Sequence, residues 1–137
     1  MSFVVTKRPV AAFPISLVVN GTNGDPLEIS FVAQYHRHTP EQLADLTDGM
    51  VNKARATQNL PPLLRPDGSQ APEYPYSSDL EFVQAKLANW LGVRDAAGDS
   101  VTFSRESLQA VITDWPELIA PLFSGFYAAH QGAQKKN

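Results

Sequence analysis

Two stretches near the start of the chain alternate apolar and other side chains with a period of two residues. Every second residue is apolar from Phe13 to Val19 and again from Leu27 to Tyr35. This alternation is typical of strands that bury one face. Residues 20–26, between the two runs, contain two glycines, which can take a positive φ, and a proline, which does not continue a central strand. The sequence therefore predicts a β-hairpin or meander within residues 1–36.

A third strand is predicted upstream of the hairpin, because Phe3, Val4 and Val5 favour extended structure. A sheet of three strands leaves one face that helices must cover. We therefore expect an α+β fold with a small N-terminal antiparallel sheet, packed with four to five α-helices that dominate the C-terminal half.

The first helix is predicted over residues 39–58. Thr39 can cap it, Pro40 fits the first helical position, and Gln42 can complete a reciprocal capping box. Residues 59–77 then hold five of the eleven prolines, which predicts a long irregular loop.

The helical part of the chain is predicted over residues 78–131. Ser78 and Glu81 indicate a helix start, and Gly92 indicates its end, with Leu87, Trp90 and other apolar residues on one face. Ser104 can cap the next helix, and the sequence at residues 114–117 both stops that helix and starts the last one. The polar tail at residues 132–137 is expected to fray.

Length and charge exclude several classes of protein. The 137 residues suit a single domain, 1–137, and the lack of cysteine excludes disulfides and thiolate metal sites. A net charge of -3 has the wrong sign for neutralising phosphates, so we expect no nucleic-acid binding. No run approaches the roughly 18 apolar residues of a membrane span. The apolar stretch after Lys7 is broken by Pro14 and lacks a cleavage site, which favours a soluble intracellular protein.

Catalytic or metal chemistry has little support in the sequence. His36 and His38 fall on the same side of a strand, but no third ligand accompanies them. Ser104, Asp114 and His130 are explained more simply as two helix caps and a polar residue at a helix end. No phosphate-binding glycine motif is present. We therefore predict that the chain is not an enzyme and has no catalytic residue, metal site or cofactor.

The C-terminal aromatic residues are candidates for a protein interface. Four of them form the predicted contact set, although each is also a natural core residue: Trp115, Phe123, Phe126 and Tyr127. Residues 79–117 hold seven acidic and three basic residues, which suits a partner with basic segments or simply keeps the chain soluble.

The segment from Trp90 to Leu108, WLGVRDAAGDSVTFSRESL, resembles the phage tail assembly chaperones of long-tailed phages and prophages. The shared pattern is an aromatic residue, Gly-Val, an Asp, a Gly and a hydrophobic-x-Phe-Ser step into a helix. Pro116, the Phe126-Tyr127 helix and the terminal Lys135-Lys136-Asn137 are also similar to the ends of family members. The resemblance covers residues 79–137 best, and the loop at residues 59–77 has no counterpart.

The resemblance implies a non-enzymatic viral protein of the bacterial host cytoplasm that is absent from the mature virion. It would bind the tape measure protein, keep it soluble and help recruit the tail-tube protein. Family members are often also made in a longer, frameshifted form, which would be a further partner.

Two other functions stay open from the residues. A structural tail or connector component would use an edge of the hairpin for strand addition between subunits. A small metal-binding protein or enzyme would be built around His36 and His38.

Overall fold

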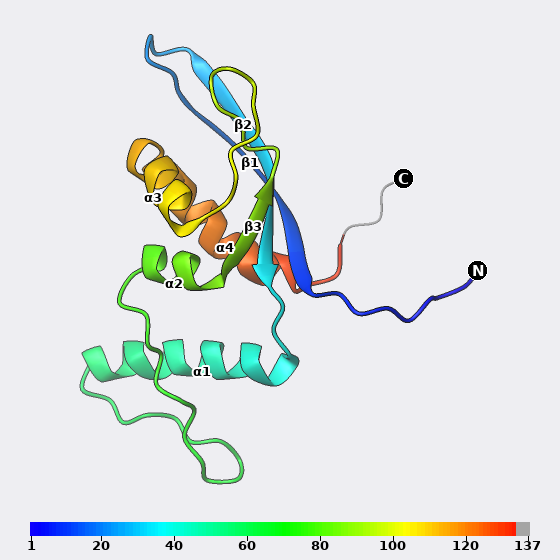
Figure 1. Ribbon diagram of the computed structural model, residues 1–137. Coiled ribbons are helices and arrows are strands. Elements are labelled where there is room, and N and C mark those ends of the chain that lie inside the picture. Colours follow the sequence, from blue (N-terminus) through cyan, green and yellow to red (C-terminus); the bar gives the residue numbers. More distant parts are fainter. Residues whose placement is uncertain (134–137) are drawn as a thin grey trace. The chain divides into compact units, whose positions relative to one another are not determined.

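The computed structural model describes residues 1–133 (Figure 1). Contacts within the chain divide it into two compact units, where the sequence predicts one domain. The first unit combines Met1–Arg37 with the chain from Ser77 onward, and the second is His38–Tyr76. A three-stranded antiparallel sheet and four α-helices place the chain in the α+β class, as predicted. The predicted frayed tail at residues 132–137 lies mostly outside the described residues.

The predicted hairpin is confirmed as strands β1 (Val10–Asn20) and β2 (Pro26–His36) of the first unit. The two strands pair antiparallel along their whole length. Their inward face is the predicted apolar one, and Ile15, Phe31 and Tyr35 on it are buried. Pro14 is tolerated in the middle of β1 because β1 is an edge strand of the sheet, where a missing N–H costs no ladder bond.

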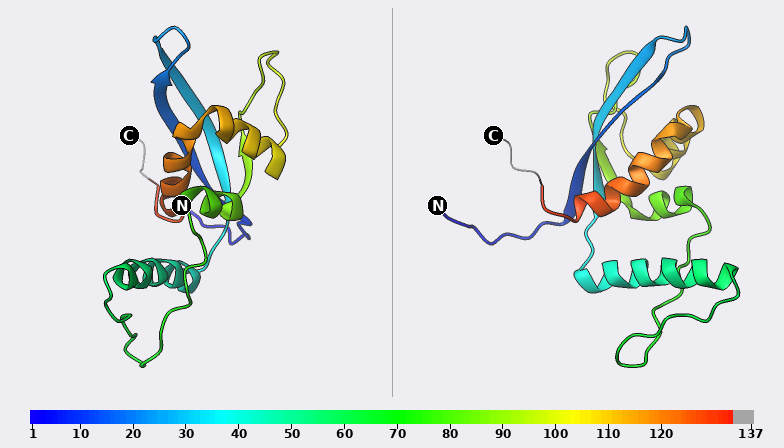
Figure 2. Two further views of the ribbon diagram at one scale, coloured as in Figure 1. Left: turned by 90° about the vertical axis from the view of Figure 1, so that its left-hand side faces the viewer. Right: turned by 180° about the vertical axis from the view of Figure 1, so that it is seen from behind.

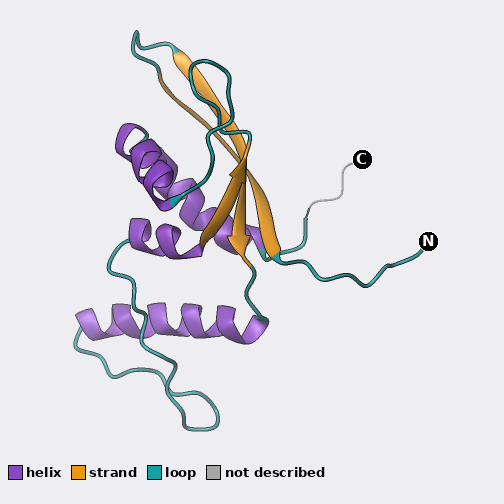
Figure 3. Cartoon of the chain, viewed as in Figure 1, coloured by secondary structure: helices purple, strands orange, loops and turns teal. Residues whose placement is uncertain are grey.

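The third strand is not where the sequence predicts it. Residues 3–6 form no strand, and the side chains of Phe3, Val4 and Val5 are 75–85% exposed. The third strand is β3 (Leu87–Leu91), which pairs antiparallel with the second half of β2, from Val32 to Tyr35 (Figure 3). Among the described residues of the first unit nothing covers the apolar side chains of residues 3–5, whereas β3 has a helical layer beside it.

The predicted helix from Ser78 to Leu91 is therefore wrong in its second half. Helix α2 (Asp79–Lys86) ends at Lys86, and β3 begins at the next residue, Leu87. The pairing of β3 with β2 shifts register between Gln34 and Tyr35, so β3 has a bulge. A bulge adds one residue to the strand and reverses the alternation of its faces. Leu87 and Trp90 consequently both point inward, three residues apart, which is the spacing that indicates a helix.

Three helices of the first unit lie on one side of the sheet (Figures 1 and 2). They are α2, α3 (Arg105–Asp114) and α4 (Ile119–Ala129), with a single 3₁₀ turn, η1 (Pro116–Leu118), joining the last two. Helix α4 packs on β1 and β2, and α2 packs on α4. This helical layer covers the apolar face of the sheet, the face that the sequence predicts helices must cover.

The helix starts follow the predicted caps. The Ser78 hydroxyl accepts a hydrogen bond from the backbone N–H of Glu81 (3.1 Å), and the Ser104 hydroxyl accepts one from Ser107 (3.0 Å). Helix α3 ends at Asp114, and Pro116 begins η1, as the sequence predicts. Each cap satisfies a backbone donor that the first helical turn leaves without an intrahelical partner.

The centre of the core joins the sheet to α4 through Tyr35. This side chain is fully buried, and its hydroxyl donates a hydrogen bond to the carbonyl oxygen of Leu122 (2.7 Å). Burial raises the pKa of the Tyr35 phenol well above its ordinary value. Gly125 allows this close approach, because a Cβ there would lie 2.6 Å from the Tyr35 oxygen. Phe126 packs edge-on against the Tyr35 ring (5.7 Å between centroids).

The second unit consists of helix α1 (Pro40–Thr57) and the irregular segment that follows it. The predicted capping box is confirmed: the Thr39 hydroxyl accepts from Gln42 N–H (3.2 Å), and the Gln42 side chain accepts from Thr39 N–H (2.8 Å). The proline-rich segment folds back along α1. Arg65 pairs with Asp45 (2.6 Å), and Gly49 lies so close to Pro72 that a Cβ would be 2.9 Å from its carbonyl oxygen.

Candidate functional site

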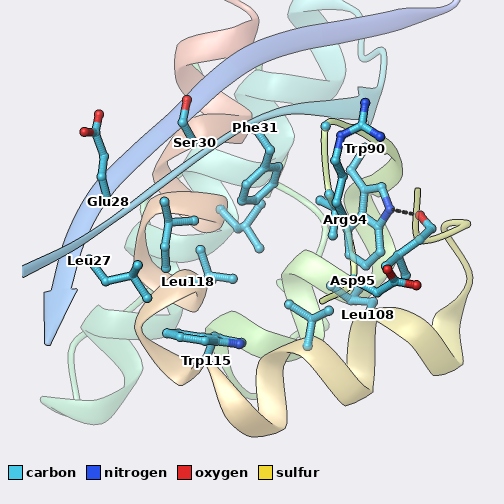
Figure 4. A pocket seen from close by; sticks show the side chains of 16 residues that line it. Leu27, Glu28, Ser30, Phe31, Trp90, Arg94, Asp95, Leu108, Trp115 and Leu118 are labelled. Carbon is cyan, nitrogen blue, oxygen red and sulfur yellow. Dashed lines mark hydrogen bonds between the residues drawn. The ribbon is translucent and has the colours of Figure 1, made fainter. Parts of the chain in front are cut away.

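The strongest candidate site is a groove beside the outer half of β2. Strand β3 ends opposite Val32, and Gly92, at a φ of 90°, turns the chain away from the sheet. Residues 93–101 then form a loop that stands apart from the rest of β2. The space between holds a cavity of about 490 Å³, walled on its other side by α3, η1 and the start of α4 (Figure 4).

The loop that forms one wall of the groove is a tight hairpin. Asp95 N–H donates to the Asp99 carbonyl (2.9 Å) and Gly98 N–H donates to the Asp95 carbonyl (3.0 Å), with Gly98 at a φ of 87°. This is a type I turn followed by a left-handed glycine. Residues 95–98 therefore make the turn at the end of this hairpin.

Trp90 fixes this hairpin to the core. Its indole Nε1 donates a hydrogen bond to the Val101 carbonyl (2.7 Å), and its ring lies edge-on to Phe103 at 5.1 Å. The ring is 5% exposed, so the loop is tied to a buried side chain. The segment that carries the family resemblance thus builds one wall of the groove.

The floor and the helical wall of the groove are apolar. Leu108, Leu118 and Leu122 are buried beneath it, and Val111 and Trp115 are half-buried at its side. Figure 4 shows Trp115 and Leu118 facing the inward side chains of β2. An apolar groove of this kind suits the side chains of another polypeptide.

Within residues 1–133, no strand lies beside the β2 edge along the groove. On this side β2 is paired only from Val32 to Tyr35. The bond from Gly21 N–H to the Asp25 carbonyl (2.8 Å) sets the hydrogen-bonding phase of the hairpin. Because this phase alternates along a strand, the backbone N–H and C=O groups of Glu28 and Ser30 point away from β1, toward the open edge. Their side chains point to the outer face of the sheet (Figure 4).

The surroundings of the groove are acidic. A second hollow, of about 650 Å³, lies between the hairpin tip and residues 114–117, and Leu27 and Trp115 line both spaces. Five carboxylates line the two: Asp25, Glu28, Asp95, Asp114 and Glu117. The one cation among the lining residues is Arg94, whose guanidinium donates to the Gly98 carbonyl of its own loop (3.1 Å). The site therefore favours a basic partner.

The structure separates the four predicted contact residues. Trp115 lines the groove. Phe126 is fully buried, so in the folded protein it belongs to the core and offers no surface to a partner. Phe123 and Tyr127 are half-buried, and both rings pack against Phe82 (4.8 and 5.9 Å between centroids). The core interpretation of the stripe therefore holds for Phe126, and Trp115 is the member closest to a candidate site.

The two histidines of the alternative metal site lie in different units, His36 in the first and His38 in the second. Among residues 1–133 no group of three or more His, Asp or Glu side chains could hold a metal ion. Ser104 is a helix cap, and His130 Nδ1 lies 2.8 Å from the Phe126 carbonyl at the end of α4. Ser104 and His130 thus each contact the backbone at the end of a helix.

Sequence reasoning suggested an edge of the hairpin for strand addition but did not identify the open edge of β2, because that edge depends on how short β3 is. The signal was present in the sequence: Gly92 and the turn at residues 95–98 lie too close to Trp90 for β3 to extend further.

Comparison of the chain with models of known families, with curated proteins and with solved structures finds no match. None of the helices within residues 1–133 is both long and apolar enough to cross a membrane.

Proposed function

We propose that the chain is a phage tail assembly chaperone, a non-enzymatic protein that binds the tape measure protein and assists assembly of the tail tube. The observation that carries this proposal is that the segment of family resemblance lies at the groove. The segment that resembles the family, residues 90–108, also forms one wall of an apolar groove.

The chemistry of the groove supports a role in covering another chain. A long helical protein whose apolar stripe is not yet buried tends to aggregate, and transient coverage of that stripe prevents this. The apolar wall formed by Val111, Trp115 and Leu118 suits such a stripe, and the acidic surroundings suit basic residues beside it. The same proposal includes four further points. The chain would act in the host cytoplasm and be absent from the mature particle. It would also bind the tail-tube protein and have a longer, frameshifted form.

The test is recovery of partners by the N-terminally tagged chain expressed from its native locus, with proteins identified by mass spectrometry. We expect a very long, helix-rich protein among them. Val111→Asp places a charge in the apolar wall and should reduce this recovery about tenfold or more. Thr113→Asp is the matched control, since Thr113 is exposed on the same helix and does not line the groove. Equal recovery by the two variants would contradict the proposed surface.

A second function, a structural tail or connector component, is favoured by the unpaired β2 edge. Such a component stays in the particle, whereas a chaperone leaves it. Mass spectrometry of purified virions separates the two, because finding this chain in them in stoichiometric amounts would favour the structural role.

A further inference from the structure

The first unit exposes one segment that resembles an unpaired strand. Residues 2–7 form no helix or strand, and their apolar side chains are uncovered: Phe3 is 85% and Val5 is 81% exposed. We call residues 2–8 the arm. Its residues alternate so that Phe3 and Val5 share one face, and Lys7 and Arg8 follow at its end. No acidic residue precedes Asp25 in the chain.

The arm is fixed at its base, at the end of the hairpin opposite to the groove. Arg37 donates hydrogen bonds to the carbonyl oxygens of Arg8 (2.8 Å) and Val10 (2.8 Å). Val10 pairs with His36, whereas the open edge around Ser30 lies opposite Ser16. The six residues from Val10 to Ser16 span about 20 Å of strand.

The arm cannot lie along the open edge of its own chain. From Arg8, the three residues to Val5 reach at most about 11 Å and the five residues to Phe3 at most about 18 Å. Both distances are shorter than the distance along the hairpin to Ser30. The open β2 edge that can accept Phe3 and Val5 together is therefore that of another molecule.

We infer that the arm of one copy of this chain adds as a strand to the open β2 edge of a second copy, with Phe3 and Val5 in the apolar groove. The backbone groups of Glu28 and Ser30 would pair with the arm, as in other cases of strand addition. Lys7 and Arg8 of the arm would lie near the carboxylates of the second copy, Asp25 and Glu28 among them. The partner is a second copy because the chain itself supplies both complementary parts.

The most direct test is a disulfide between copies, since the chain has no cysteine of its own. Neighbouring strands hold residues about 4.5–5.5 Å apart between Cα atoms, within the range that a disulfide bridges. With Phe3 and Val5 in the groove, Val4 lies on the same sheet face as Ser30. The experiment mixes Val4→Cys with Ser30→Cys, one of them carrying a longer tag, under mild oxidation.

We expect a heterodimer band on a non-reducing gel. The control pairs Ser30→Cys with Leu64→Cys, an exposed position in the second unit, 64% exposed. A heterodimer yield no higher than in this control would overturn the inference. Binding of the arm within one molecule would give the same negative result, because the two cysteines reside in different molecules.

Sedimentation of the full chain gives a second measurement. The double variant Phe3→Asp, Val5→Asp places carboxylates in an acidic, apolar groove and should weaken self-association at least tenfold. Leu64→Asp is the control for an added surface charge and should leave association unchanged. A wild-type chain that does not associate, or an arm variant that associates as the wild type does, would contradict the inference. The inference does not rest on the proposed chaperone function.

Discussion

Two residues at the centre of the first unit, Tyr35 and Gly125, decide how closely the sheet and α4 can approach. A Cβ at position 125 would meet the Tyr35 oxygen at 2.6 Å and Ile15 Cδ1 at 3.0 Å. Gly125→Ala should therefore destabilise the first unit by about 1–2 kcal/mol, because overpacking outweighs the helix propensity gained. Urea unfolding monitored by tryptophan fluorescence measures this loss of stability, since Trp90 and Trp115 both belong to the first unit.

Ser124→Ala is the matched control for Gly125→Ala. Ser124 is the preceding residue of α4 and is exposed, so its substitution should change stability by less than about 0.5 kcal/mol. A Gly125→Ala protein as stable as the control would mean that α4 does not pack as described.

The buried phenol of Tyr35 makes stability sensitive to alkali. Its pKa is raised in the folded state, so its contribution is fully present below the unfolded pKa of about 10 and is lost as the pH rises above it. We expect the free energy of unfolding to fall by up to about 1.4 kcal/mol per pH unit in that range because of this group. Tyr35→Phe should remove this part of the slope, as urea unfolding at a series of alkaline pH values would measure. Equal slopes in both proteins would contradict it.

At the scale of elements, Trp90 joins β3 to the groove hairpin. Trp90→Phe removes the indole donor to the Val101 carbonyl while keeping most of the ring packing against Phe103. We expect a loss of about 1–2 kcal/mol and faster proteolysis within residues 93–101, where the loop is released from the core. Limited proteolysis with mass spectrometry locates the cuts. Unchanged cutting in this loop would show that Trp90 does not hold it.

The elements that the sequence predicts well are those with local signals. The period of two in β1 and β2, the Thr39 and Ser104 caps and the break at Pro116 each depend on neighbouring residues, and all are confirmed. β3 was predicted as helix, because its bulge gives Leu87 and Trp90 a helical spacing. Only the pairing with β2, a long-range contact, decides between the two.

For the candidate site too, the sequence predicts what depends on neighbouring residues and does not predict what depends on long-range contacts. Trp115 was predicted as a contact residue from aromatic density alone, and it does line the groove. The sequence suggested an edge of the hairpin for strand addition, but the groove beside β2 was not predicted, because β2, residues 93–101 and the helical wall are far apart in the sequence. Phe126 could not be assigned to core or surface until the position of Tyr35 was known.

At the scale of the whole molecule, the two proposals compete for one groove. The client is the tape measure protein that we propose as the partner. If the arm of a second copy and the client bind at this same site, then freeing the groove should favour binding of the client. The double variant Phe3→Asp, Val5→Asp should then recover more of the long partner than the wild type does in the tagged pull-down. Lower recovery would mean that the arm takes part in client binding, and equal recovery that the client binds elsewhere.

The central claim is that the groove beside β2 is where this chain holds its client. Hydrogen exchange of the full chain, alone and in the complex recovered from the native locus, tests it most directly. We predict that slower exchange on binding is concentrated at the outer half of β2, at residues 93–101 and in α3, with α1 unchanged. Protection confined to other segments, or the absence of any recoverable complex, would contradict the account.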